Sequence, residues 1–161
     1  FGARRIVAID VADDKLAAAV ELGATDTVNS AKVNAREAVM ELTGGRGVDV
    51  AFEVLGRPQT WLTALDVLRD GGRMVPIGLG AGVQKAEVEI NRTVRRSQSI
   101  IGSYGARTRR DLPEVVRMAA AGVIDYRHIV SRRYGLDEVA AGYQQLHDGQ
   151  ITGRAVVDMS L

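Results

Sequence analysis

The chain of 161 residues contains no cysteine, so it has no disulfide, no thiol nucleophile and no thiolate ligand for zinc. Its two histidines, His128 and His147, stand too far apart to form an i, i+4 ligand pair on a helix. No apolar run approaches the ~20 residues of a membrane-spanning helix, and no signal-peptide pattern precedes the first predicted strand. We therefore expect no metal bound by this chain alone, no membrane contact and a cytoplasmic location.

The chain also lacks an excess of either charge. It has 21 basic and 20 acidic residues, a net charge of +1, and only 4% aromatic residues. Such a balance creates no strong field for nucleic acid or an anionic membrane surface. The basic pairs Arg95-Arg96, Arg109-Arg110 and Arg132-Arg133 have no interleaved aromatic residues, so we interpret them as solvated surface. We expect no nucleic-acid partner.

Length and composition suit one domain covering residues 1–161, because apolar residues make up 46% and charged residues 25% of the chain. The first residue is Phe1 rather than methionine, and the chain starts almost directly with a strand pattern. We therefore expect the chain to be the downstream part of a longer polypeptide, and its single domain to be incomplete at the N-terminus.

Short apolar runs alternate with helical patterns of about ten residues along the whole chain. Strands are predicted over 6–9, 26–29, 48–54, 73–77, 99–103 and 155–157, an edge strand over 84–90, and helices over 13–22, 34–42, 58–69, 111–121 and 136–146. This alternation predicts an α/β fold, a doubly wound parallel sheet of the Rossmann type.

An acidic residue, Asp10, ends the first predicted strand, and a helix follows at once. In nucleotide-binding α/β folds a carboxylate at this place binds the adenosine ribose through its 2′ and 3′ hydroxyls. A 2′-phosphate would meet like charge there, and the next residue is Val11 rather than arginine, which favours NAD over NADP. An aspartate after a strand is also typical of a helix cap, so this stretch alone leaves both interpretations open.

Two glycine clusters differ in their place along the fold. Gly44-Gly45-Arg46-Gly47 follows a helix and precedes a strand, which predicts a turn at the amino end of the sheet. Gly78-Leu79-Gly80-Ala81-Gly82 follows a strand on the ligand side, where it either admits a cofactor or forms a loose loop. A pyrophosphate-binding G-x-G-x-x-G loop belongs roughly 20 residues before Asp10. We therefore expect that loop and the first strand of the fold to lie upstream of Phe1.

The order of several motifs resembles that of zinc-type alcohol dehydrogenases of the medium-chain dehydrogenase/reductase superfamily. These motifs are Ile6-Val7-Ala8-Ile9-Asp10, Lys15-Leu16, Glu21-Leu22-Gly23-Ala24, Val28-Asn29, Gly47-Val48-Asp49, Phe52-Glu53-Val54, Gly78, Ile101-Gly102-Ser103-Tyr104 and Gly153-Arg154-Ala155-Val156-Val157. The resemblance covers essentially the whole chain. It is specific for the superfamily and much weaker for the substrate.

The resemblance implies a cofactor-binding role for residues at or near strand ends. Asp10 and Lys15 would contact the adenosine ribose, and Arg154 would reach the pyrophosphate. The adenine side would be bordered by Val54, Leu55 and Arg57, and the nicotinamide side by Ile77, Gly78, Leu79, Ser103 and Tyr104. Open parallel sheets bind ligands at this edge. Other interpretations stay open, because Lys15 also fits a solvated helix residue, Arg154 a strand-edge cover, and Ser103 with Tyr104 a turn.

The resemblance implies NAD as cofactor, and hydride transfer between an alcohol and an aldehyde or ketone in the whole enzyme. Zinc is expected only in a separate catalytic domain that this chain does not contain, so we assign no catalytic residue and expect the isolated chain to be inactive. A homodimer joined through an edge strand at Ala86–Asn91 is also implied. Without the first strand, its neighbours would expose unpaired edges.

Two alternatives are weighed against this interpretation. One is an NADP-linked, zinc-free quinone or enoyl reductase of the same superfamily, which would need a basic site for the 2′-phosphate and is disfavoured by Asp10 with Val11. The other is a non-catalytic nucleotide-sensing module. A zinc-ligand domain upstream would distinguish the dehydrogenase from this module.

Overall fold

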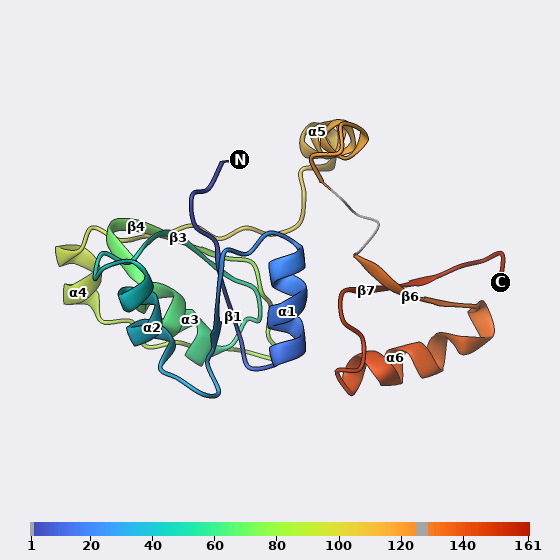
Figure 1. Ribbon diagram of the computed structural model, residues 1–161, viewed down its shortest axis with the longest axis horizontal. Helices are drawn as coiled ribbons and strands as arrows, with labels where there is room; N and C mark the ends of the chain where they lie inside the picture. The colour runs from blue at the N-terminus through green and yellow to red at the C-terminus, as the bar shows by residue number, and fades with distance from the viewer. Residues whose placement is uncertain (1, 125–128) are drawn as a thin grey trace. The chain divides into compact units, whose positions relative to one another are not determined.

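The structure is a computed structural model that describes residues 2–124 and 129–161. The chain divides into two compact units, Phe1–Tyr104 and Gly105–Leu161, and each is described by itself (Figure 1). Both units are built from parallel strands connected through helices, so the predicted α/β class is confirmed.

The first unit begins with a two-stranded parallel sheet, in which β1 (Val7–Asp10) pairs with β2 (Asp26–Asn29). The crossover helix α1 (Asp13–Glu21) starts with two acidic residues, whose negative charges interact favourably with the positive end of the helix dipole. The side chain of Leu16 in this helix is buried. Gly23 follows with φ of 106°, the left-handed conformation that allows the chain to leave a helix. The predicted strand, helix and glycine stop are all confirmed here.

The remaining strands of this unit form a three-stranded parallel sheet, in the order β3 (Val48–Glu53), β4 (Leu68–Pro76) and β5 (Ser99–Ile100). Helix α2 (Ala35–Leu42) leads into it, and the Asn34 side chain caps this helix by accepting from the Glu37 amide at 3.1 Å. Helix α3 (Pro58–Asp66) connects β3 to β4 and starts with proline in its first turn.

The hydrophobic core of the first unit lies between these strands and helices α2 and α3. Its most buried side chains are Val39 from α2 and Leu68 and Met74 from β4, all at most 1% exposed. Burial of such side chains contributes about 1.5–3 kcal/mol each to the stability of the unit.

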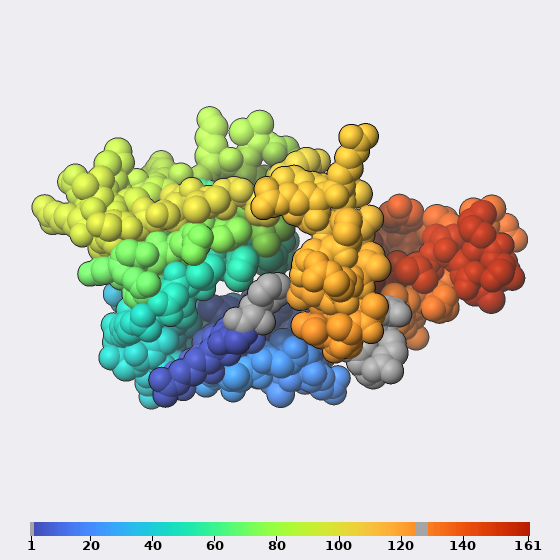
Figure 2. Space-filling model, turned by 90° about the horizontal axis from the view of Figure 1, so that it is seen from above, coloured from blue at the N-terminus to red at the C-terminus, as the bar shows by residue number. Residues whose placement is uncertain are grey.

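The two sheets of the first unit share no strand pairing. Strand β1 pairs only with β2, and β3 pairs only with β4, so each has one open edge among the described residues. In Figure 2 the blue N-terminal segment and the green segment near residue 70 lie in separate places on the face drawn. Apolar side chains beside these edges stay in contact with water, since Ile9 is 37% and Phe52 65% exposed. The expected unpaired edges are thus found.

The second unit contains helix α5 (Thr108–Ala120) and a parallel pair, β6 (Val130–Tyr134) with β7 (Arg154–Val157). The 3₁₀ turn η1 (Leu136–Glu138) and helix α6 (Val139–His147) connect the two strands. Tyr134 is buried against Gly142, and its hydroxyl donates to Gln145 Oε1 at 2.7 Å. Strand β7 and helix α6 agree with the sequence prediction, whereas β6 was not predicted.

The edge strand predicted over 84–90, and with it the strand at Ala86–Asn91, is wrong. Residues 83–89 pair with no strand, and helix α4 (Ile90–Arg95) starts at the end of this segment. The alternation of Val88 and Ile90 with glutamates is a local pattern, whereas a strand needs a neighbour to receive its hydrogen bonds, and the described chain offers none here. The helix predicted over 58–69 is shorter, because α3 ends at Asp66 and β4 begins at Leu68.

Within residues 2–124 and 129–161, no helix has both the length and the apolar character needed to cross a membrane.

Candidate functional site

The candidate site lies where β1, β3 and β4 end, at the carboxyl edges of the two sheets in the first unit. The turn after β1 begins at Asp10, the turn after β3 follows Glu53, and the turn after β4 follows Pro76. Parallel strands within a sheet end at the same edge, and ligands of open α/β sheets bind there.

The Asp10 carboxylate is fixed by the backbone of the turn that follows it. Its Oδ1 accepts hydrogen bonds from the amides of Val11 at 2.7 Å and Ala12 at 3.0 Å. These amides precede α1, and the helix has no side-chain cap, so Asp10 does not act as the helix cap that the sequence left open. Among the described residues Oδ2 accepts no hydrogen bond, which leaves one carboxylate oxygen available to the hydroxyl groups of a ligand.

A polar network ties the start of α1 to the end of β2. The Lys32 Nζ donates to Asp13 Oδ2 at 2.6 Å, and Asn29 Nδ2 donates to Asp13 Oδ1 at 2.7 Å. The hydrogen bonds from Lys32 and then Asn29 lower the pKa of the Asp13 carboxyl below its ordinary value, so Asp13 is ionised at neutral pH. Lys15, two residues further along α1 and exposed, makes no ion pair within the described part of the chain.

Glu53, at the end of β3, holds the turn that follows it and is only 2% exposed. Its carboxylate accepts from the amides of Leu55 and Gly56 at 2.9 Å and from Thr60 Oγ1 at 2.7 Å. Its carbonyl oxygen accepts from the amides of Ile77 at 2.7 Å and Gly78 at 3.1 Å. One residue therefore fixes the turns after β3 and β4, and every buried polar side-chain atom described in this structure has a partner.

The turns after β3 and β4 cross in direct backbone contact at glycines. A Cβ on Gly78 would lie 2.3 Å from the Gly56 nitrogen, and a Cβ on Gly56 would lie 2.3 Å from the Gly80 nitrogen. Of the two uses the sequence allowed for the 78–82 cluster, a loose loop is wrong, because its first two glycines are packed against another turn. The approach to a cofactor stays a prediction.

Three of the predicted site residues meet at one hollow of about 680 Å³ beside this crossing. Leu55 and Arg57 line it from the turn after β3, and Leu79 lines it from the turn after β4. Leu55 and Leu79 are 54% and 76% exposed, so the wall is apolar and open to water, with the exposed Arg57 as its cation. Such a mixed wall suits a ligand with a planar apolar part and a negative charge.

Other predicted site residues lie next to the hollow without lining it. Val54 and Ile77 are the exposed residues that directly follow β3 and β4. Ser103 continues beyond β5, where its amide donates to the Pro76 carbonyl at 3.0 Å, and Tyr104 follows with 87% exposure. The remaining one, Arg154, starts β7 in the second unit.

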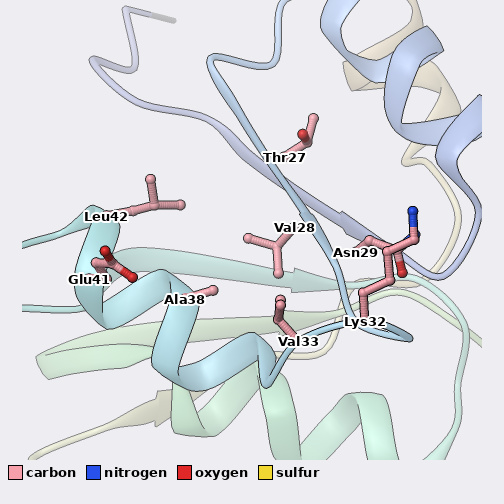
Figure 3. A pocket seen from close by; sticks show the side chains of 8 residues that line it. All are labelled: Thr27, Val28, Asn29, Lys32, Val33, Ala38, Glu41 and Leu42. Atoms are coloured by element: carbon pink, nitrogen blue, oxygen red, sulfur yellow. The ribbon is translucent and has the colours of Figure 1, made fainter.

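A second hollow, of about 460 Å³, lies between β2 and α2 (Figure 3). Its floor is apolar, formed by Val28, Ala38 and Leu42, with Lys32 at one end and Glu41 at the other. Lys32 therefore belongs both to the end of this hollow and to the Asp13 network. Sequence reasoning assigned no role to Asp13 beyond the start of a helix, because its partners come from the following strand and turn.

No three His, Cys, Asp or Glu side chains come together as metal ligands within 2–124 and 129–161. A zinc ion therefore does not fit the described residues, and no chemistry is assigned to one here.

Comparison with known proteins supports the same family. The model of the zinc-binding dehydrogenases matches residues 1–121. Sorbitol dehydrogenase of Bacillus subtilis is 32% identical over 86% of this chain, and L-threonine 3-dehydrogenase of Burkholderia vietnamiensis is 28% identical over 98% of it. The chain spans 38% and 45% of the lengths of these two relatives.

Solved structures agree with the fold. Benzyl alcohol dehydrogenase of Acinetobacter calcoaceticus matches 97% of this chain with a TM-score of 0.89 and 26% identity, over 43% of its own length. An alcohol dehydrogenase of Aeropyrum pernix matches 94% with a TM-score of 0.81 and 32% identity, over 42% of its own length. The predicted Rossmann-type fold is thereby confirmed. The chain belongs to the zinc-binding dehydrogenase family.

Proposed function

We propose that the chain binds NAD at the carboxyl ends of β1, β3 and β4 and forms the cofactor-binding part of an alcohol dehydrogenase. The observation that carries the proposal is the geometry of Asp10, whose Oδ1 is held by two backbone amides while Oδ2 has no partner among the described residues. A carboxylate oriented in this way can accept from both hydroxyls of an unphosphorylated adenosine ribose.

The other predicted residues are proposed to bind the remaining parts of the dinucleotide. Lys15 would contact the ribose that Asp10 holds, and Arg154 the pyrophosphate. The adenine side is assigned to Val54, Leu55 and Arg57, and the nicotinamide side to Ile77, Gly78, Leu79, Ser103 and Tyr104. The exposure of Leu55, Arg57 and Leu79 at one hollow, and the fixed crossing of the two turns at Gly78, support a ligand at this edge without separating the adenine side from the nicotinamide side.

Bound nicotinamide supplies the hydride chemistry, and the residues of this chain bind and orient it. In the whole protein the substrate would be an alcohol, oxidised to an aldehyde or ketone, since a sorbitol dehydrogenase and a benzyl alcohol dehydrogenase are among the similar proteins. No zinc ligand set exists in the described residues, so the isolated chain is expected to show no alcohol oxidation. Association of two copies through residues 86–91 also stays a proposal, although this segment forms no strand within the chain.

The proposal is tested by titrating NAD and NADP against the purified chain, with Asp10→Asn as the variant. Loss of one charged hydrogen-bond acceptor is expected to weaken NAD binding about tenfold or more, since such a bond contributes ~1.5–3 kcal/mol. Asp14→Asn is the matched control, because Asp14 is exposed in the first turn of α1, which follows Asp10 closely, and its replacement removes the same charge. Equal affinity of the two variants for NAD, or no binding by the wild-type chain, would contradict the proposal.

A further inference from the structure

We propose that Asp13 sets the preference of this site for NAD over NADP by holding Lys32, whose ammonium group would otherwise bind the 2′-phosphate of NADP. The inference rests on the proposed function and adds a specificity residue three positions beyond Asp10. It assigns a role to the Asp13–Lys32 ion pair, which is not needed for any of the contacts proposed with NAD.

The pairing register brings the two turns together. Asp10 pairs with Asn29 in the parallel β1–β2 ladder, and the Ser30 amide donates to the Asp10 carbonyl at 2.9 Å. The turn that carries Lys32 therefore starts beside the residue proposed to hold the ribose. Figure 3 shows Lys32 and Asn29 at the same end of the hollow beside β2.

Both carboxylate oxygens of Asp13 are used in this turn. Oδ2 accepts from Lys32 Nζ at 2.6 Å and Oδ1 accepts from Asn29 Nδ2 at 2.7 Å. Lys32 is 63% exposed, so the pair adds little to stability, but it fixes where the ammonium group points and neutralises its charge. The lowered pKa of the Asp13 carboxyl keeps the pair ionised at neutral pH.

The charges around the ribose position then disfavour a phosphate. Asp10, Asp13 and Asp14 are acidic, while Lys15 and Lys32 are basic, so the group carries one net negative charge. A 2′-phosphate adds nearly two further negative charges and would have to compete with Asp13 for Lys32. An ammonium group released from Asp13 would instead be a free point charge for that phosphate. A preference of this kind arises because the site disfavours binding of the wrong ligand, here NADP.

The test compares the dissociation constants of NAD and NADP for the wild-type chain, Asp13→Asn and Asp14→Asn. Both variants remove one negative charge from the first turn of α1, but only Asp13→Asn releases Lys32. We expect the ratio of the NADP to the NAD dissociation constant to fall about fivefold in Asp13→Asn at low salt and less than twofold in Asp14→Asn. Adding Lys32→Gln to Asp13→Asn is expected to restore the wild-type ratio.

The single variant Lys32→Gln is expected to leave both dissociation constants within twofold of wild type, because Lys32 is already paired. Equal ratios for Asp13→Asn and Asp14→Asn, with NAD still bound by the wild-type chain, would overturn this inference and leave the proposed function standing. A gain of NADP binding that survives Lys32→Gln would overturn it as well. Absence of NAD binding by the wild-type chain would overturn the proposed function itself.

Discussion

Replacing Gly78 by alanine is expected to destabilise the first unit by about 3 kcal/mol. The new Cβ would lie 2.3 Å from the Gly56 nitrogen, 2.4 Å from the Leu55 nitrogen and 2.5 Å from the Val54 carbonyl carbon. All three are backbone atoms, so no side-chain rotation can relieve the overlap, and the turn after β3 or β4 has to move.

The magnitude has two sources. Overpacking of a close contact costs about 1–3 kcal/mol. Moving the turn after β4 also weakens the hydrogen bond from the Gly78 amide to the Glu53 carbonyl, now 3.1 Å long, at a cost of about 1 kcal/mol. Gly78 has no left-handed φ, so backbone strain adds nothing to this sum.

Urea unfolding followed by circular dichroism measures the effect, as a lower midpoint at an unchanged slope. Gly102→Ala is the matched control, because Gly102 also lacks a left-handed φ and a Cβ there would meet nothing within 4 Å. We expect that control to be neutral or to stabilise by up to about 1 kcal/mol. Equal midpoints for the two variants would refute the close crossing of the turns.

Three further predictions concern buried and charged groups. Glu53→Gln is expected to cost about 1–3 kcal/mol in urea unfolding, because the amide NH₂ that replaces Oε2 would face the Gly56 amide, which now donates to Oε2 at 3.0 Å; a value below that of Thr60→Val would contradict this role. The pKa of the Asp13 carboxyl, measured by NMR, is expected to lie below the ordinary aspartate value of 3.8 and to be higher in Lys32→Gln. Because the pKa of Asp13 is lowered in the folded state, its contribution to stability is present above about pH 4 and is lost as the pH falls. An Asp13 titration that is unchanged in Lys32→Gln would contradict the pairing. Leu68→Ala is expected to cost about 2–5 kcal/mol, since Leu68 is 0% exposed, and a loss under 1 kcal/mol would contradict its place in the core.

Local patterns predicted the elements whose signals are local. Helix α1 begins at two acidic residues and ends before Gly23, and helix α2 begins after Asn34, close to the predicted bounds 13–22 and 34–42. The order of strands and helices, and with it the Rossmann-type class, followed from the same periodicities. These features depend on residues that are close together in the sequence, so the local sequence is enough to predict them.

Features that depend on distant partners were missed or wrong. Glu53 continues a strand pattern in the sequence, and its role appears only where the turns after β3 and β4 meet. The Asp13–Lys32 pair joins residues on two separate turns. The strand predicted at 84–90 failed for the same reason, since alternation of side chains does not supply a neighbouring strand. Of the predicted site residues, Leu55, Arg57 and Leu79 line one hollow that the sequence did not indicate, and their binding role stays a prediction.

The central claim, that the carboxyl ends of β1, β3 and β4 bind a dinucleotide, is tested most directly by amide NMR shifts of the chain during a titration with NAD. We predict the largest shifts at Val11 and Ala12, whose amides hold Asp10, with smaller ones at Leu55 and Leu79. Saturating NAD that leaves the Val11 and Ala12 amides unchanged would contradict the account.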